Sequence, residues 1–273
     1  MRARTLCRSS SAEILALNAK ISDWRRQRVW VIGASSGIGA AFAALLMERG
    51  ARVALSARSG PALETLARNY PQDRAQVLVL DVRDARQIQA AHQALLKNWG
   101  GYDLLVYCAG SFVPQRAWDF QLDTVRELFA TNVEGVYACL SVALPQLIKQ
   151  GSGGIGIVGS VAGYSGLPKS LVYGPTKAAL LNLCETLYLD LAPKGIAVYA
   201  INPGFVRTRL TDQNDFAMPA LMEPNAAAAA MVAGLERGEF EIHFPKRFSW
   251  FMKLLRHMPY WLYFLIARRA AKP

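Results

Sequence analysis

The stretch VWVIGASSGIGAAFAALLM, residues 29–47, decides the fold. A short run rich in β-branched residues, Val29 to Ile32, leads into three glycines spaced GxxxGxG, and the apolar segment Ala40 to Met47 follows. Glycines at such a turn let the backbone bend tightly and approach a phosphate, whose charge is favoured at the N-terminus of the next helix. We therefore expect a phosphate-binding loop between a strand and a helix, made of Gly33, Ser35, Ser36, Gly37, Ile38 and Gly39.

The same alternation of short β-branched runs and longer amphipathic stretches continues along the chain. It predicts strands at Val29 to Ile32, Arg52 to Ala57, Gln76 to Leu80, Leu104 to Tyr107, Ile155 to Val158, Ile196 to Ile201 and Glu239 to His243. Helices are expected near 38–49, 61–69, 84–98, 121–149, 171–192 and 225–237. This pattern is typical of an α/β fold with a single Rossmann-type, doubly wound parallel sheet and helices on both faces. Ligands bind such a sheet at the carboxyl ends of its strands.

Composition indicates a globular protein without a metal centre. The chain has 273 residues, of which 52% are hydrophobic and 19% charged, enough for one large domain with a substantial core. Its four cysteines lie far apart and never form CxxC, and its three histidines show no ligand spacing. We expect free thiols in a reducing, cytoplasmic setting and no metal site.

The net charge of +11 belongs to the two ends of the chain. Residues 1–28 hold seven basic and two acidic side chains, and residues 246–273 hold seven basic and no acidic ones. Between them, residues 29–245 hold 17 basic and 18 acidic side chains. Because no basic stripe crosses the central part, we expect no nucleic-acid partner.

A tyrosine and a lysine four residues apart, Tyr173 and Lys177, form a candidate proton-transfer pair. On a helix, i and i+4 side chains share a face, so an ammonium can lie beside a phenol. A unit charge roughly 4 Å away contributes up to about 4 kcal/mol, enough to lower the pKa of a tyrosine by one or more units. Ser160, thirteen residues upstream, is a neutral donor that could hold a carbonyl oxygen.

These motifs together resemble those of the short-chain dehydrogenase/reductase family over roughly residues 28–240. The resemblance rests on Gly33-xxx-Gly37-Ile38-Gly39, Asp81-Val82, Cys108-Ala109-Gly110, Asn132, Ser160, Tyr173-xxx-Lys177 and Pro203-Gly204, in the family's order and spacing. It implies a Rossmann-type fold, a nicotinamide cofactor, a small-molecule carbonyl or alcohol substrate, and a homo-oligomer.

The resemblance also implies a role for each matching residue. Tyr173 corresponds to the general acid/base, Lys177 to the residue that lowers its pKa and holds the nicotinamide ribose, and Ser160 to the substrate-positioning serine. Asn132 corresponds to an asparagine that bends a helix and holds a water in the proton path. The expected cofactor contacts beyond the glycine loop are Arg58, Asp81, Val82, Cys108, Ala109, Gly110, Tyr173, Lys177, Pro203, Gly204, Val206 and Thr208.

Two residues depart from the family pattern, and a proline indicates where the helix with Tyr173 begins. Cys108 replaces an asparagine and Ile32 a threonine, which puts local hydrogen bonding in doubt but not the chemistry. Pro175 would break a helix interior and is tolerated in a first turn, so we expect the helix to begin close to Tyr173.

Arg58 indicates the cofactor. It follows the second predicted strand, where an acidic residue at position 57 would bind the ribose hydroxyls of NAD, and Ala57 cannot do so. The Arg58 guanidinium can pair with a 2′-phosphate, and Ser56 could add a hydrogen bond. NADP(H) is therefore the expected cofactor, with NAD(H) as the alternative.

A loop and two neighbouring residues suggest an apolar substrate. The segment Arg209 to Pro224 is a candidate lid that carries Phe216, Met218, Leu221 and Met222. Tyr164 and Leu167 are expected to add apolar surface near the catalytic residues.

The two ends divide the chain into residues 1–27, expected to be a flexible extension, a catalytic domain at 28–245, and a basic extension at 246–273. A helical wheel drawn from Phe248 puts Lys253, Arg256 and His257 in one sector and Phe251, Met252, Leu255 and Leu262 opposite. Pro259 and the charges make the extension too short to span a bilayer. Its apolar face either lies at a membrane surface, as a peripheral element, or packs on its own domain or a partner subunit.

The sequence thus predicts an NADP(H)-dependent oxidoreductase that interconverts an apolar ketone and a secondary alcohol, with Tyr173 as general acid/base. The alternative is a catalytically idle NADP(H)-binding sensor of the same fold.

Overall fold

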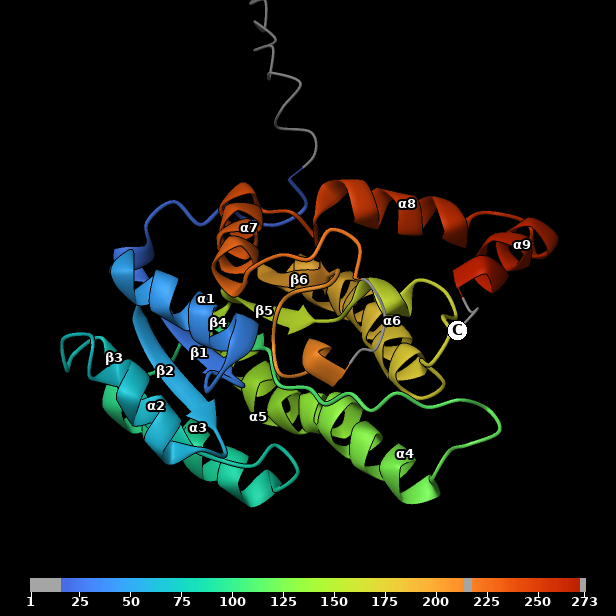
Figure 1. The fold of residues 1–273 in the computed structure, drawn as a ribbon. Coiled ribbons are helices and arrows are strands. Elements are labelled where there is room, and N and C mark those ends of the chain that lie inside the picture. The colour runs from blue at the N-terminus through green and yellow to red at the C-terminus, as the bar shows by residue number, and fades with distance from the viewer. Residues whose placement is uncertain (1–15, 214–217, 271–273) are drawn as a thin grey trace, which may run out of the picture.

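Seven parallel strands form one sheet in the order β3-β2-β1-β4-β5-β6-β7 (Figure 1). The computed structural model describes residues 16–213 and 218–270. Its strands are β1 Arg28–Ile32, β2 Arg52–Ala57, β3 Ala75–Val79, β4 Leu104–Tyr107, β5 Gly153–Val158, β6 Ile196–Pro203 and β7 Glu241–Phe244. The winding reverses between β1 and β4, which opens a crevice at their carboxyl ends. The predicted fold class and strands are confirmed, with ends shifted by one or two residues.

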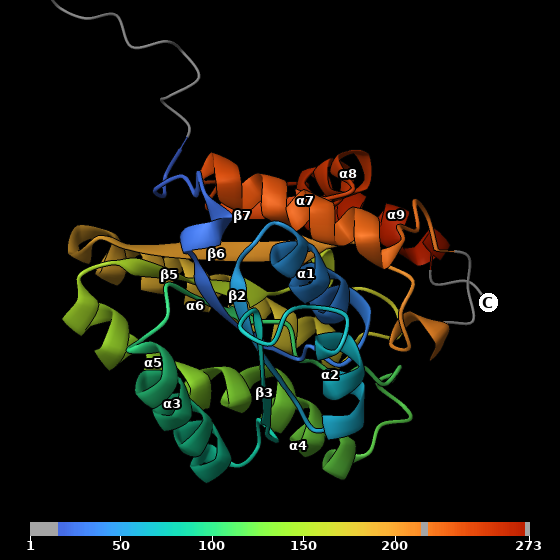
Figure 2. The ribbon, with the colours of Figure 1, turned by 90° about the vertical axis from the view of Figure 1, so that its left-hand side faces the viewer.

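Helices cover both faces of the sheet (Figures 1 and 2). They are α1 Gly37–Glu48, α2 Gly60–Ala67, α3 Ala85–Trp99, α4 Leu122–Phe129, α5 Gly135–Gln150, α6 Tyr173–Leu191, α7 Pro224–Arg237, α8 Lys246–Arg256 and α9 Tyr260–Ala270. Successive strand side chains point to opposite faces, so Val29 and Val31 pack in one core with α1, α2 and α7. Trp30 and Ile32 pack in a second core with α3, α5 and α6.

The helix predicted at 121–149 is interrupted. Residues Ala130–Glu134 form a π-helical segment between α4 and α5, and π segments of this kind are frequent at functional sites. By length and composition alone, Leu122–Gln150 could span a membrane. Val136, Leu140 and Ala143 are instead buried against the sheet, so this stretch is a core element.

The expectation of a flexible extension over 1–27 is wrong for residues 16–27. Asn18 donates from Nδ2 to the Val198 carbonyl at 2.8 Å, and its Oδ1 accepts from the Val198 N–H at 3.1 Å. Trp24 is buried in the core and donates its indole N–H to Glu236 at 2.8 Å. These contacts fasten the segment to β6 and α7, and residues 1–15 lie outside the described part.

The C-terminal extension forms two helices, α8 and α9, which are separated at Pro259. Met252 and Leu255 are buried with Val161 and Tyr164, as the alternative of packing on the same domain predicts. Phe251, expected on the same face, is instead 47% exposed.

Candidate active site

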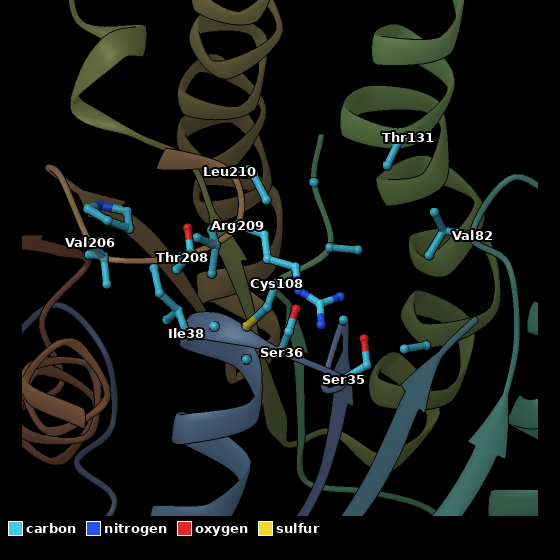
Figure 3. A pocket seen from close by; sticks show the side chains of 18 of the residues that line it. Ser35, Ser36, Ile38, Val82, Cys108, Thr131, Val206, Thr208, Arg209 and Leu210 are labelled. Atoms are coloured by element: carbon cyan, nitrogen blue, oxygen red, sulfur yellow. The ribbon is translucent and has the colours of Figure 1, made fainter. Parts of the chain in front are cut away.

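A cavity of about 470 Å³ opens at the carboxyl ends of the central strands (Figure 3). Every residue of the glycine loop and every catalytic or cofactor contact that the family resemblance implies lines it, except Asn132. The glycine loop after β1, the ends of β2, β3 and β4, the start of α6 and the turn after β6 all contribute. The topology therefore brings the separate motifs to one place.

The glycine loop is built for close backbone approach. Gly33 has a φ of +90°, and a Cβ there would lie 2.6 Å from the Ala109 nitrogen. A Cβ at Gly39 would collide with the Gly33 carbonyl, and one at Gly37 would lie 2.9 Å from Cγ2 of Thr208. The loop thus faces the turn after β6. Ser36 precedes α1 without a side-chain capping bond, which leaves the first N–H groups of α1 open to an anion.

Ser160 follows β5 and caps the 3-10 turn Val161–Gly163. Its Oγ accepts the Ala162 N–H at 3.1 Å, which orients the side chain. The hydroxyl proton is directed to the Pro203 carbonyl over a long 3.5 Å. A substrate oxygen nearer than this would compete well for that proton.

Tyr173 and Lys177 occupy the first turns of α6. The helix begins at Tyr173 and Pro175 lies in its first turn, which confirms the predicted helix start. Lys177 is buried, and its Nζ lies 5.6 Å from the centre of the Tyr173 ring. The same Nζ donates to the Val158 carbonyl at 2.9 Å.

The pKa of Tyr173 in this structure differs from the lowered value that the sequence predicts. Burial raises the pKa of Tyr173 to about 12, while hydrogen bonding with Ser160 acts to lower it. Burial lowers the pKa of Lys177 to about 8. The expected lowering of the Tyr173 pKa by Lys177 is absent in this geometry, because desolvation dominates and Nζ bonds Val158. At pH 7 the phenol is protonated and Lys177 is mostly charged.

Asn132 supports the site from behind the cavity. Its Oδ1 accepts the Ser111 N–H at 2.8 Å, and its Nδ2 donates to the Ser111 carbonyl at 3.0 Å and to Oγ1 of Thr176 at 3.1 Å. The side chain is fully buried within the π segment. It thus ties the loop after β4 to α6.

The cavity end formed by β2 and β3 carries Arg58 and Asp81. The Asp81 carboxylate accepts from the Arg83 guanidinium at 2.6 Å, which lowers the pKa of Asp81, and the charge of Arg58 acts in the same direction. Ser56 is fully buried and its Oγ accepts the Trp30 indole N–H at 2.9 Å. The prediction of a Ser56 contact to the cofactor is therefore wrong, because Ser56 points into the core; Ser59 lines the cavity instead.

Among the residues at or beside the site that were not predicted as contacts are Arg209, which was assigned only to the candidate lid, and Phe112. Arg209 extends into the cavity toward Ser36 (Figure 3), and it follows directly on the predicted contact Thr208. The Phe112 ring packs edge-on against Tyr173 at 5.0 Å between centres. Its position two residues beyond Gly110 was the available signal.

The expected apolar surface is only partly present. Tyr164 and Leu167 pack with α8 and α9 and do not line the cavity, because the Tyr164 hydroxyl donates to Glu241 instead. Of the candidate lid, Met222 packs against the core, and Phe216 lies outside the described residues.

Comparison with protein families decides the family. Residues 27–217 match the family model for short chain dehydrogenases. The chain belongs to this family. It is thus an oxidoreductase that acts on CH–OH groups with NAD(P).

Relatives of this short-chain dehydrogenase agree in sequence and structure. An uncharacterized oxidoreductase from Myxococcus xanthus is 37% identical over 246 residues, 88% of this chain and 95% of the relative. A short-chain dehydrogenase from Streptomyces avermitilis has a TM-score of 0.76 and 29% identity, and the match covers 84% of this chain and 91% of that one. Another from Sphingobium yanoikuyae, in complex with NADPH, has a TM-score of 0.74 and 26% identity, covering 85% and 96%.

The residues present fit the dinucleotide that this short-chain dehydrogenase requires. The glycine cradle leaves no room for a Cβ at Gly33 or Gly39, and the uncapped N-terminus of α1 faces the same space. Among the described residues, three basic side chains line the cavity, Arg58, Lys177 and Arg209, against one acidic side chain, Asp81. Such a lining favours an anionic ligand with phosphate groups.

Proposed function

We propose that this enzyme interconverts ketones and secondary alcohols with NADP(H), and that Tyr173 is its general acid/base. The observation that carries the proposal is the presence of Ser160, Tyr173 and Lys177 in the same cavity as the glycine loop. A donor, a protonated phenol and a cation next to a dinucleotide site are what carbonyl reduction requires.

The protein groups would act on the carbonyl oxygen. Bound NADPH supplies the hydride for the carbonyl carbon. Ser160, oriented by Ala162, donates a hydrogen bond to the oxygen, and the protonated Tyr173 gives it the proton. As the phenolate forms on Tyr173, Nζ of Lys177 would have to turn from the Val158 carbonyl toward it for its charge to stabilise the phenolate. In the oxidative direction the same proton returns to Tyr173.

Arg58 supports a preference for NADP(H). It lines the cavity next to Ala57, and an alanine there offers no carboxylate to a ribose hydroxyl. A guanidinium can form a bidentate pair with a 2′-phosphate. The Sphingobium yanoikuyae relative in complex with NADPH is consistent with this choice.

Phe112 supports an apolar substrate. Its ring lies against Tyr173, so a substrate whose oxygen reaches that hydroxyl passes next to an aromatic surface. We propose that this contact, together with Met218 and Leu221 of the loop 209–224, favours hydrophobic ketones.

The test is the consumption of NADPH with a panel of aliphatic and aromatic ketones. We expect turnover with at least one apolar ketone and a fall in kcat of about 100-fold or more in Tyr173→Phe, with NADPH binding retained. Tyr137→Phe, an exposed tyrosine on α5, is the matched control. Tight NADPH binding without turnover on any ketone would favour the idle sensor, and full activity of Tyr173→Phe would refute the assigned acid.

A further inference from the structure

The outer side of α8 and α9 is unusually apolar. The inner side packs on the domain through Met252, Leu255 and Tyr263. The outer side exposes seven large apolar or aromatic side chains: Trp250, Phe251, Leu254, Tyr260, Trp261, Phe264 and Leu265. Trp261 and Tyr260 are 71% and 78% exposed. We call these seven residues the outer face.

The spacing shows that the outer face is one stripe on each helix. Trp250, Phe251 and Leu254 follow the spacing i, i+1, i+4, and residues 260, 261, 264 and 265 repeat it with one further position. Side chains at these spacings share a helix face. On a surface helix, the side turned from the core is normally polar. Both helices lie along one margin of the molecule (Figures 1 and 2).

The stretch of sequence that carries the outer face has only basic charges. Residues 246–273 carry seven basic and no acidic side chains. Lys253 pairs with Glu241 and Lys246 lies 3.8 Å from Glu239, both on the domain side. Arg247, Arg256 and Arg268 are exposed and form no ion pair within the described part of the chain.

We propose that the outer face of α8 and α9 docks on an anionic membrane surface. Tryptophan and tyrosine favour the boundary between headgroups and acyl chains, and arginines beside them can pair with lipid phosphates. A second copy of this chain fits less well, because a symmetric contact would bring Arg247, Arg256 and Arg268 of one copy against the same cations of the other.

Docking would also orient the catalytic domain. The Tyr263 hydroxyl of α9 donates to the Gly166 carbonyl, in the loop that follows Ser160. The segment between β5 and α6, which begins with Ser160, is therefore held next to the docking helices. This orientation rests on the proposed function, whereas docking itself does not.

The experiment is sedimentation of the full chain with vesicles of phosphatidylcholine, with or without phosphatidylglycerol. We expect binding to the anionic vesicles that weakens with added salt. The double variant Trp261→Ser/Leu265→Ser should lose it by more than about tenfold. The matched control Tyr137→Ser/Leu189→Ser removes two exposed apolar side chains from α5 and α6 and should bind like the wild type. NADPH binding by each variant verifies that the domain is folded.

Two results would overturn the proposal. One is that the wild type sediments with neither kind of vesicle, or to the same extent with neutral and with anionic vesicles. The other is a wild-type dimer in lipid-free ultracentrifugation that Trp261→Ser/Leu265→Ser converts to a monomer, because the outer face would then be covered by a second copy. Neither double variant changes a residue of the cavity. A variant that no longer binds vesicles but still reduces ketones would therefore show that docking and the proposed catalytic function fail independently.

Discussion

Two arginines enter the cavity at different points, and this separates their effects on cofactor binding. Arg58 lies at the end of β2 near Asp81, whereas Arg209 reaches toward Ser36 at the glycine loop. A charge-assisted hydrogen bond contributes about 1.5–3 kcal/mol, or roughly 10–100-fold in affinity. We expect Arg58→Ala to weaken NADPH binding by that factor and to leave NADH almost unchanged. We expect Arg209→Gln to weaken both, because both carry the diphosphate.

Titration of each variant with NADPH and with NADH, followed by fluorescence, measures this difference. Arg207→Gln is the control, because Arg207 pairs with Glu223 at 2.8 Å and does not line the cavity. Equal losses for both cofactors in Arg58→Ala would contradict the role of Arg58 at the 2′-phosphate.

The lowered pKa of His243, on β7, leads us to expect a loss of folding stability in mild acid. Burial lowers its pKa to about 4 from the model-peptide value of 6.5, with Lys253 and Lys246 acting in the same direction. The folded state therefore favours the neutral ring, whose Nδ1 lies 2.6 Å from Oγ of Ser249. The stabilisation is complete above pH 6.5 and is lost as pH falls toward 4, because the unfolded chain takes up a proton first.

Urea unfolding at pH 7.5 and pH 5 tests this. The wild type should lose stability between the two values, and His243→Asn should lose less. His92, whose pKa burial also lowers, remains in the variant, so part of the slope persists. If the free energy of unfolding depended on pH identically in both proteins, His243 would not be a cause of the loss of stability in acid.

At the scale of elements, local patterns predicted the strands and most helices, and distant contacts decided the rest. The β-branched runs and the glycine loop need only neighbouring residues. The π segment depends on Asn132 bonding Ser111 and Thr176, the latter 44 residues away. Tyr164 lies away from the predicted site because its hydroxyl donates a hydrogen bond to Glu241, 77 residues later in the chain. A single sequence does not reveal such pairs, whereas the cavity motifs lie together because strand ends meet at one edge.

The contact between the Val161–Gly163 turn and α6 is an element-scale determinant of the active site. A Cβ at Gly163 would lie 2.7 Å from the backbone carbon of Lys177. Gly163→Ala must therefore push α6 away from the turn that Ser160 caps. We expect a loss of about 1–3 kcal/mol in stability and a lower kcat. Gly166→Ala is the control, since its nearest neighbour would be the Tyr263 hydroxyl at 3.8 Å. Equal effects of both substitutions on kcat and unfolding would contradict this.

For the whole molecule, residues 16–27 and the helices α8 and α9 are part of the folded body. Asn18 and Trp24 fasten the N-terminal segment to β6 and α7. Glu241 joins α8 to the domain by accepting from Lys253, Tyr164 and Asn202. The cavity lies among elements that are thus connected from end to end, so a ligand bound there should stabilise the entire fold.

Cofactor binding should therefore appear in the thermal unfolding of the full chain. A ligand at about 100 times its Kd adds about 2.7 kcal/mol, which corresponds to a rise in Tm of roughly 5–10 °C for a domain of this size. We expect NADPH to raise the Tm more than NADH at the same concentration, and Arg58→Ala to abolish the difference. Scanning calorimetry measures it without a substrate, so the result is independent of the identity of the substrate. A larger shift with NADH than with NADPH would reverse the cofactor assignment, because the cofactor with the larger shift is the one that binds the native state more tightly.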